Sequence, residues 1–179
     1  MSARSAELAT LRRVQRAIAS PPVVRMARAM SLFGEHSAGW CVLGVLGAVA
    51  DRPRRREWLT ATAGVVAAHA ASIAVKRVIR RPRPDDPEVR VLVGTPSQLS
   101  FPSSHAASTT AAAVLYGGLT GHRSTATVVP PMLLSRLVLG VHYPSDVLAG
   151  SALGALVGAG VLRWLRSRTG EVTDRRGLS

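Results

Sequence analysis

The stretch "SRLVLGVHYPSD", residues 135–146, places an arginine inside one apolar run and a histidine and an aspartate just before the next. Arg136 lies between "MLLS" and "LVLG", within a run from Thr125 to Val141, and a further apolar run begins at Val147. A cation in such a run is costly unless it meets an anion or a water-filled cavity. The stretch therefore predicts helices packed in a bilayer around a polar site.

The composition of the whole chain supports a membrane protein. Of its 179 residues 47% are hydrophobic, yet the formal net charge is +13 and the pI is about 11.8. Basic residues crowd into four segments, 4–28, 52–56, 77–90 and 163–176, between runs rich in alanine, valine, leucine and glycine. An evenly basic chain would suggest nucleic-acid binding. Apolar spans with cationic junctions are instead typical of polytopic membrane proteins, so we expect no nucleic-acid partner.

The apolar runs predict an all-α transmembrane bundle of about five helices, or six if a further span lies between Pro22 and Phe33. Several runs are short for a bilayer, which needs about 20 residues per helix. We expect residues 35–166 to form the transmembrane catalytic domain and the polar residues 167–179 to form a disordered tail. The five expected spans cover residues 36–50, 58–75, 106–119, 125–141 and 147–162.

The N-terminal region, residues 1–34, is expected to be amphipathic and interfacial. Leu8, Leu11, Val14 and Ile18 recur at helical spacing, with arginines on the other side of the helix. Such a helix can lie on the membrane surface. It can equally pack on its own protein, and the pattern does not separate the two.

The order of the spans predicts which loops share a face of the membrane. Two spans separate the 77–104 loop from the 142–146 turn, so both lie on one side. The other side receives 51–57, 122–124 and the arginine-rich C-terminus. By the positive-inside rule that side is cytoplasmic, which places the 77–104 loop outside the plasma membrane. The basic N-terminus, on the loop side after five spans, opposes this assignment.

Three clusters of chemically active residues fall on the loop side. Taken singly, each has a structural explanation: a lysine at a helix end can snorkel, a serine can cap a helix, and an aspartate can complement a helix N-terminus. Together they predict one site. The clusters are Lys76 with Arg83-Pro84, then Pro102-Ser103-Ser104-His105, and finally Ser135-Arg136 with His142 and Asp146.

This set of residue types fits phosphoryl transfer. Arginine forks and a lysine can grip phosphate oxygens, and the amides near Ser103, at a helix start, favour an anion. A histidine held by Asp146 keeps one nitrogen free to attack phosphorus, and a second histidine can protonate the departing oxygen. No group of carboxylates is placed to hold a metal, and Cys41 is the only cysteine. We therefore expect a phosphohistidine mechanism without metal or cofactor.

The combined spacing resembles the PAP2 family, the type-2 phosphatidic acid phosphatases related to vanadium haloperoxidases. That family has a lysine, six residues and Arg-Pro; a Pro-Ser-Gly-His; and Ser-Arg, five residues, His, three residues, Asp. The first and third patterns match in full, and Ser104 replaces the glycine of the second. The resemblance covers residues 57–165 and implies a PAP2/haloperoxidase-like helical core.

The resemblance also implies roles for individual residues. Because glycine permits close approach and positive φ, Ser104 is expected to alter rate or substrate preference. Arg80-Arg81-Pro82, a second Arg-Pro pair outside the motif register, is expected to attract a lipid headgroup. The implied roles are phosphate binding by Lys76, Arg83, Ser103, Ser104 and Arg136, nucleophilic attack by His142, its orientation by Asp146, acid catalysis by His105, and a phosphate contact or helix-end bond by Ser135.

The implied activity is that of an integral-membrane lipid phosphatase acting on a polyprenyl-type carrier in bacterial cell-envelope synthesis. Abundant arginine and alanine indicate a GC-rich genome such as an actinobacterial one, and favour decaprenyl-phosphoryl-phosphoribose as substrate. Undecaprenyl pyrophosphate and phosphatidylglycerophosphate are the competing substrates, and no residue separates the three. A lipid phosphotransferase and a non-catalytic lipid-binding protein are the alternatives from other classes. The oligomeric state is left open.

Overall fold

The computed structural model describes residues 3–176, with side chains through Arg168, and confirms the all-α prediction. No β-strand occurs among these residues; one isolated bridge joins Pro82 and Leu99. Short 3-10 turns precede α3, α4 and α6. The helices are α1 (Ala3–Ile18), α2 (Pro21–Gly34), α3 (Ala38–Ala50), α4 (Arg55–Ile79), α5 (Ser104–Thr120), α6 (Val129–Val138) and α7 (Pro144–Arg176).

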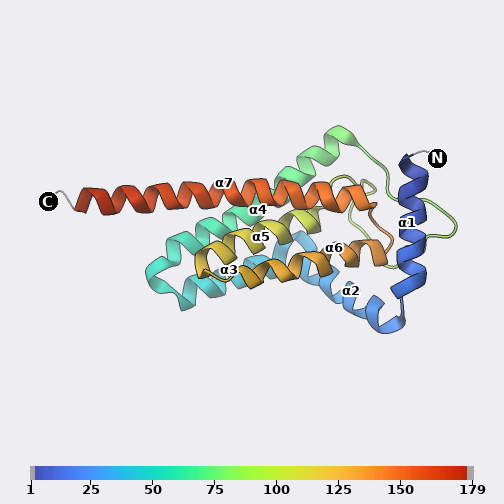
Figure 1. Ribbon diagram of the computed structural model, residues 1–179, viewed down its shortest axis with the longest axis horizontal. Coiled ribbons are helices and arrows are strands. Elements are labelled where there is room, and N and C mark those ends of the chain that lie inside the picture. Colours follow the sequence, from blue (N-terminus) through green and yellow to red (C-terminus); the bar gives the residue numbers. More distant parts are fainter. Residues whose placement is uncertain (1–2, 177–179) are drawn as a thin grey trace.

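The chain runs back and forth along the bundle, with α4, α5 and α7 at its centre (Figure 1). Three segments of the described chain are long and apolar enough to cross a membrane: Pro21–Ala50, Arg52–Ile79 and Pro144–Arg168. Helices α5 and α6, with 17 and 10 residues, fall short of the length of a full span. The number of helices that cross the bilayer therefore stays a prediction.

Helix α7 is longer than the sequence led us to expect. The disordered tail was expected from residue 167, but the helix continues to Arg176. No proline follows Pro144 in the chain, so nothing in the backbone forces the helix to stop earlier. Residues 177–179 of the expected tail lie outside the described residues.

Helices α5 and α7 pack closely because α7 presents glycines to the backbone of α5. A Cβ atom on Gly154 would lie 2.1 Å from the Ala107 carbonyl oxygen, and one on Gly150 would lie 2.4 Å from that of Ser103. Small residues allow such approach between helices in lipid. The result is that the start of α5 lies against the start of α7, where the Ser103 amide donates to the Asp146 carbonyl oxygen at 2.9 Å.

The outer surface of the bundle is apolar. Helix α3 exposes a set of large aliphatic side chains. Exposing such a surface to water is unfavourable, whereas exposing it to lipid acyl chains is not. We therefore treat the bundle as embedded in a membrane. The exposed side chains of α3 are Val42, Leu43, Val45, Leu46 and Val49.

Helix α1 lies across one end of the bundle, roughly perpendicular to its axis (Figure 1). Leu11 is fully buried against Val89 and Tyr143. The Gln15 amide nitrogen donates to the carbonyl oxygens of Arg90 at 2.7 Å and Val138 at 3.0 Å. Of the two alternatives for this helix, packing on its own protein is the one observed. The 80–103 loop and the turn between α6 and α7 reach the same end, as the order of the spans predicted.

Candidate active site

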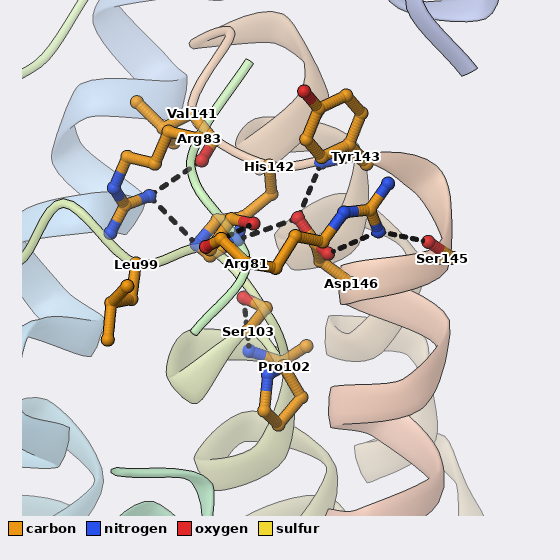
Figure 2. A network of polar contacts seen from close by, with 12 residues as sticks. Arg81, Arg83, Leu99, Pro102, Ser103, Val141, His142, Tyr143, Ser145 and Asp146 are labelled. Carbon is orange, nitrogen blue, oxygen red and sulfur yellow. Dashed lines mark hydrogen bonds and ion pairs between the residues drawn. The ribbon is translucent and has the colours of Figure 1, made fainter. Parts of the chain in front are cut away.

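The loop after α4 presents two arginines in opposite directions. Helix α4 ends where Arg80 adopts the left-handed conformation, with φ 52°. The chain then becomes extended and pairs with the segment before α5 through the Pro82–Leu99 bridge. The contacts place their side chains on different sides of the site: Arg81 bonds to Asp146 at the start of α7, whereas Arg83 bonds to the carbonyl oxygens of Ser97 and Val141. Figure 2 shows them approaching the His142–Asp146 pair from two sides.

His142 has the tautomer that a nucleophile needs. Its Nε2 lies 3.4 Å from Arg83 Nη1, which can only donate, so Nε2 carries the lone pair. Its Nδ1, 3.5 Å from Asp146 Oδ2, then carries the hydrogen and faces the carboxylate. Asp146 is fully buried, and its Oδ2 also accepts from the Tyr143 amide at 2.8 Å. The carboxylate is thereby fixed at the first turn of α7, behind the imidazole (Figure 2).

The environment keeps His142 neutral. Burial, and then the charges of Arg136, Arg83 and Lys76, hold the pKa of His142 well below its usual value of 6.5. Burial also lowers the pKa of Arg83 to about 10, against the opposing effects of Asp146 and Glu35, so Arg83 stays charged at neutral pH. An uncharged imidazole therefore lies among cations, ready to attack an anionic phosphate that those cations attract.

Arg136 is a buried cation with unused hydrogen-bond donors. Only 1% of its surface is exposed, and among the described residues its Nε and Nη1 find no hydrogen-bond partner. A buried guanidinium in this condition requires an anion. The neighbouring Ser135 bonds within its own helix, from Oγ to the Met132 carbonyl oxygen at 2.6 Å. Of the two roles expected for Ser135, the helix bond is the one observed.

Lys76 donates to three backbone carbonyls that converge just before α5. Its Nζ lies 2.6 Å from the Pro102 oxygen, 2.9 Å from that of Ser100 and 3.4 Å from that of Leu99. An ammonium has three donors in a tetrahedral arrangement, whereas a guanidinium is a larger planar fork. The geometry explains the only lysine of the chain: it fixes the loop that leads into Ser103, at the edge of the cavity.

The serines at the start of α5 are both engaged. Ser103 is buried and caps the helix, since its Oγ accepts from the Ala106 amide at 3.4 Å. The Oγ of Ser104 accepts from Ser72 of α4 at 2.7 Å. Ser104 begins the helix and is not among the residues with positive φ, so this backbone does not require the glycine of the family motif. Ser104 also lines the cavity.

His105 is oriented by helix α2. Its Nε2 lies 3.0 Å from the Ser31 carbonyl oxygen, which can only accept, so Nε2 carries a hydrogen. The other nitrogen, Nδ1, is then the one available to exchange a proton within the site. A segment expected to be interfacial thus supplies a contact to the predicted general acid.

Arg81 corrects one expectation from the sequence. Instead of attracting a headgroup, its Nη1 donates to Asp146 Oδ1 at 2.9 Å and to Ser145 Oγ at 2.7 Å, and its guanidinium lies 3.9 Å from the centre of the Tyr143 ring. Its Nη2 donates to Glu7 of α1. Motif spacing cannot reveal this role, and alternation along an extended loop would place Arg81 and Arg83 on the same side.

Glu7 is the second residue that the sequence did not reveal. Its Oε1 accepts from the Ser145 amide at 3.0 Å and from Ser145 Oγ at 2.6 Å. Partial burial opposes its ionisation, but the bonds from Ser145 and Arg81 hold the pKa of Glu7 below its usual value. Burial likewise opposes the charge of Arg81, whose pKa is nevertheless raised by Glu7 and Asp146. The two side chains form an ion pair that joins α1 to the start of α7.

The predicted residues meet around one cavity of about 330 Å³. Of the predicted residues, three cations, two histidines and Ser104 line this cavity, whereas Ser103, Ser135 and Asp146 do not. Within the described residues no group of three or more histidine, cysteine or acidic side chains could hold a metal ion. A cavity lined by cations suits an anion. The catalytic wall consists of Lys76, Arg83, Ser104, His105, Arg136 and His142.

The fold and this site define a class of protein. The model of the PAP2 superfamily matches residues 57–169, and the chain belongs to this superfamily. It is a phosphatase of the PAP2 class with a membrane-type helical bundle.

Two groups of known proteins are similar to it. Decaprenylphosphoryl-5-phosphoribose phosphatase of Mycobacterium tuberculosis is 56% identical over 154 residues, covering 86% of this chain and 87% of that protein. The protein of the same name from Mycolicibacterium smegmatis is 59% identical over 145 residues, covering 80% and 81%. Among solved structures, the transmembrane PAP2-type phosphatidylglycerolphosphate phosphatase of Bacillus subtilis has a TM-score of 0.74 at 23% identity, covering 91% of this chain and 86% of that one. Aquifex aeolicus LpxE has a TM-score of 0.72 at 21% identity, covering 87% and 94%. The two structures show the fold alone.

Proposed function

We propose that this protein is an integral-membrane phosphatase that removes the 5-phosphate from decaprenylphosphoryl-5-phosphoribose. The observation that carries the proposal is the buried guanidinium of Arg136, whose Nε and Nη1 have no partner among the described residues, in a cavity shared with Arg83 and His142. The substrate follows from relatives at 56% and 59% identity. The lipid would lie in the bilayer with its phosphate in the cavity.

The mechanism uses two histidines in turn. His142 Nε2 attacks phosphorus while the bond to the leaving oxygen breaks, and His105 gives that oxygen a proton. Burial and the charge of Arg136 hold the pKa of His105 well below its usual value, so His105 takes up this proton when the anionic phosphate binds beside it. Water then attacks the phosphohistidine, His105 takes a proton from that water, and the N–P bond breaks to release phosphate. Asp146 stabilises the charge on the imidazole, and Arg83 and Arg136 stabilise the charge on the phosphoryl oxygens. No step calls for a metal ion.

The test is phosphate release by the protein purified in detergent. Substrates are decaprenylphosphoryl-5-phosphoribose, undecaprenyl pyrophosphate and phosphatidylglycerophosphate, with and without EDTA. We expect the first to be preferred, EDTA to have no effect, and His142→Ala to abolish release. Exposed His122, which lies after α5 and away from the cavity, supplies the control His122→Ala, which should retain full activity.

Other outcomes favour other functions. Turnover retained by His142→Ala would overturn the mechanism, and preference for another lipid would overturn the substrate. A phosphorylated acceptor in place of free phosphate would indicate a phosphotransferase. Absence of turnover with every lipid would indicate a lipid-binding protein.

We also propose that the protein lies in the plasma membrane with the site facing outward. Arginines crowd the opposite end of the bundle, in 52–56 and 163–168, as the positive-inside rule requires of a cytoplasmic face. At the site end, Arg12 and Arg16 share the carboxylate of Glu88, and Arg81 pairs with Glu7, which offsets part of the positive charge there.

Cysteine labelling in intact cells tests this orientation. In a Cys41→Ala background, Asp85→Cys at the site end should react with a membrane-impermeant maleimide, and Ser124→Cys at the other end should not. The reverse pattern would place the site in the cytoplasm.

A further inference from the structure

The cavity extends beyond the catalytic wall. On its other side it is lined by Glu35 and His36 from the junction of α2 and α3, by His69 and Ile73 of α4, and by the loop segment 94–97. These groups have no part in the phosphoryl transfer described above. The cavity volume of about 330 Å³ is that of a small-molecule site, with room for more than a phosphate group.

The junction of α2 and α3 holds an unusual backbone conformation. His36 and Ser37 adopt φ values of 47° and 63° in succession, and neither is a glycine. Left-handed conformations of this kind are costly and persist where the surroundings enforce them, often at ligand sites. Ser37 Oγ lies 3.0 Å from His69 Nδ1, which anchors the turn to α4. The strained turn brings Glu35 and His36 to the cavity.

The end of α2 lies directly against the predicted general acid. A Cβ atom on Gly34 would be 2.7 Å from His105 Cδ2, so the absence of a side chain there allows the contact. The carboxylate of Glu35 lies between two histidines: Oε2 is 3.9 Å from His105 Nε2, and Oε1 is 3.5 Å from His36 Nδ1. Glu35 is thus the acidic group beside the imidazole of His105, on its Nε2 side, where the ring is held by the Ser31 carbonyl oxygen.

The geometry of an in-line displacement at phosphorus indicates which part of the substrate lies beside Glu35. In an in-line reaction the leaving oxygen departs opposite the attacking nitrogen, so it lies near His105 and away from His142. The alcohol that carries this oxygen must then continue past His105, into the part of the cavity beside Glu35. A carboxylate accepts hydrogen bonds and repels a second anion. An alcohol with free hydroxyl groups close to the phosphate ester fits this position, because those hydroxyls can donate hydrogen bonds to the Glu35 carboxylate. A plain hydrocarbon chain has no hydrogen-bond donors to offer it.

We propose that Glu35, assisted by His36 and His69, forms a subsite that binds the hydroxyl groups of a sugar whose phosphate is removed. The proposal rests on the proposed function and deepens it, because it names the residues by which the site would prefer a sugar phosphate to other lipid phosphates. Glu35 accepts from one or two sugar hydroxyls, and His36 and His69 offer further nitrogens to them.

The test compares matched substrates on the purified protein. The probes are octyl ribofuranoside 5-phosphate, its 2,3-dideoxy counterpart, and octyl phosphate. Hydrogen bonds to a charged group contribute about 1.5–3 kcal/mol, so the wild type should prefer the hydroxylated probe by roughly 10- to 100-fold in kcat/KM. In Glu35→Ala that ratio should fall toward one, and in Glu35→Gln, which keeps one acceptor, it should be intermediate.

The controls separate specificity from catalysis and folding. Glu57→Gln removes a carboxylate that pairs with Arg54 at the start of α4 and should keep the wild-type ratio. Thermal unfolding checks that each variant folds. If Glu35→Ala lowers kcat/KM for both ribose probes equally, or the wild type does not discriminate between them, the subsite is wrong although the phosphatase stands. If the wild type releases phosphate from decaprenylphosphoryl-5-phosphoribose but from neither ribose probe, the subsite is wrong and the phosphatase stands.

Discussion

Arg81 and Arg83 are two residues apart in one extended loop, yet their surroundings differ in kind. Arg81 lies behind the catalytic pair, bonded to the carboxylates of Asp146 and Glu7. Arg83 lies in front, bonded to the carbonyl oxygens of Ser97 and Val141 and within 3.4 Å of His142. The charge of Arg81 is neutralised by carboxylates of the protein, whereas the guanidinium of Arg83 contacts only uncharged groups.

The difference separates a structural cation from a ligand-binding one. A charge paired with carboxylates has no net attraction left for a phosphate, whereas a charge surrounded by carbonyl groups still attracts an anion. Arg136 is the clearest ligand-binding cation, since two of its nitrogens find no acceptor in the described structure. The front of the site is therefore built to bind an anion, and the back is built to hold Asp146.

The largest effect is expected from removing the unpaired cation. Arg136→Met should lower kcat/KM for phosphate release by about 10³-fold, because a principal stabiliser of the phosphoryl oxygens is lost. The same change should leave stability unchanged or raise it by about 1–4 kcal/mol, since an apolar side chain replaces an uncompensated buried charge. Phosphate release and thermal unfolding in detergent measure the two effects. A stable variant with normal turnover would show that Arg136 is not a phosphate ligand; exposed Arg123→Met is the control.

A smaller but still strong effect is expected at Lys76, whose charge meets three carbonyls. Lys76→Arg preserves the charge, but a planar guanidinium cannot replace three tetrahedral donors in a pocket where only 7% of the residue is exposed. The loop into Ser103 should shift, and kcat/KM should fall about 100-fold. Steady-state kinetics measure this loss. Near-normal turnover would show that any cation suffices there.

The smallest effect on activity is expected behind the catalytic pair. Arg81→Met should lower kcat by roughly 10-fold with little change in KM, because Asp146 loses its anchor while the phosphate ligands remain. Its cost in stability should be larger, about 3 kcal/mol, since two carboxylates lose their partner. Arg80→Met, at the neighbouring exposed position, is the control for both measurements. A rise in KM with kcat unchanged would place Arg81 among the substrate ligands and remove the contrast with Arg83.

Much of the site could be predicted because its residues occur at fixed spacing around helix ends. The helix cap at Ser103, the pairing of His142 with Asp146, and the meeting of the 77–104 loop with the 142–146 turn all follow from local spacing and the order of the spans. These are short-range consequences of helix geometry, which sequence patterns record directly.

The rest depends on contacts between distant parts of the chain. Glu7 is 138 residues from Ser145, and Ser31 is 74 residues from His105. Only the packed bundle decides that these groups meet. The sequence also does not indicate two successive left-handed residues at His36 and Ser37, because that conformation is uncommon for any residue other than glycine. Helix α1 was equally ambiguous, since an amphipathic pattern does not say whether its apolar face meets lipid or protein.

The bond between Glu7 and the start of α7 bears on the order in which the protein is made. Ser145 leaves the ribosome 138 residues after Glu7. Until then Arg81 lacks Asp146, and Glu7 lacks the amide and hydroxyl of Ser145. Contacts that span most of a chain form late in folding. A nascent chain therefore has no assembled catalytic centre until the start of α7 has been synthesised.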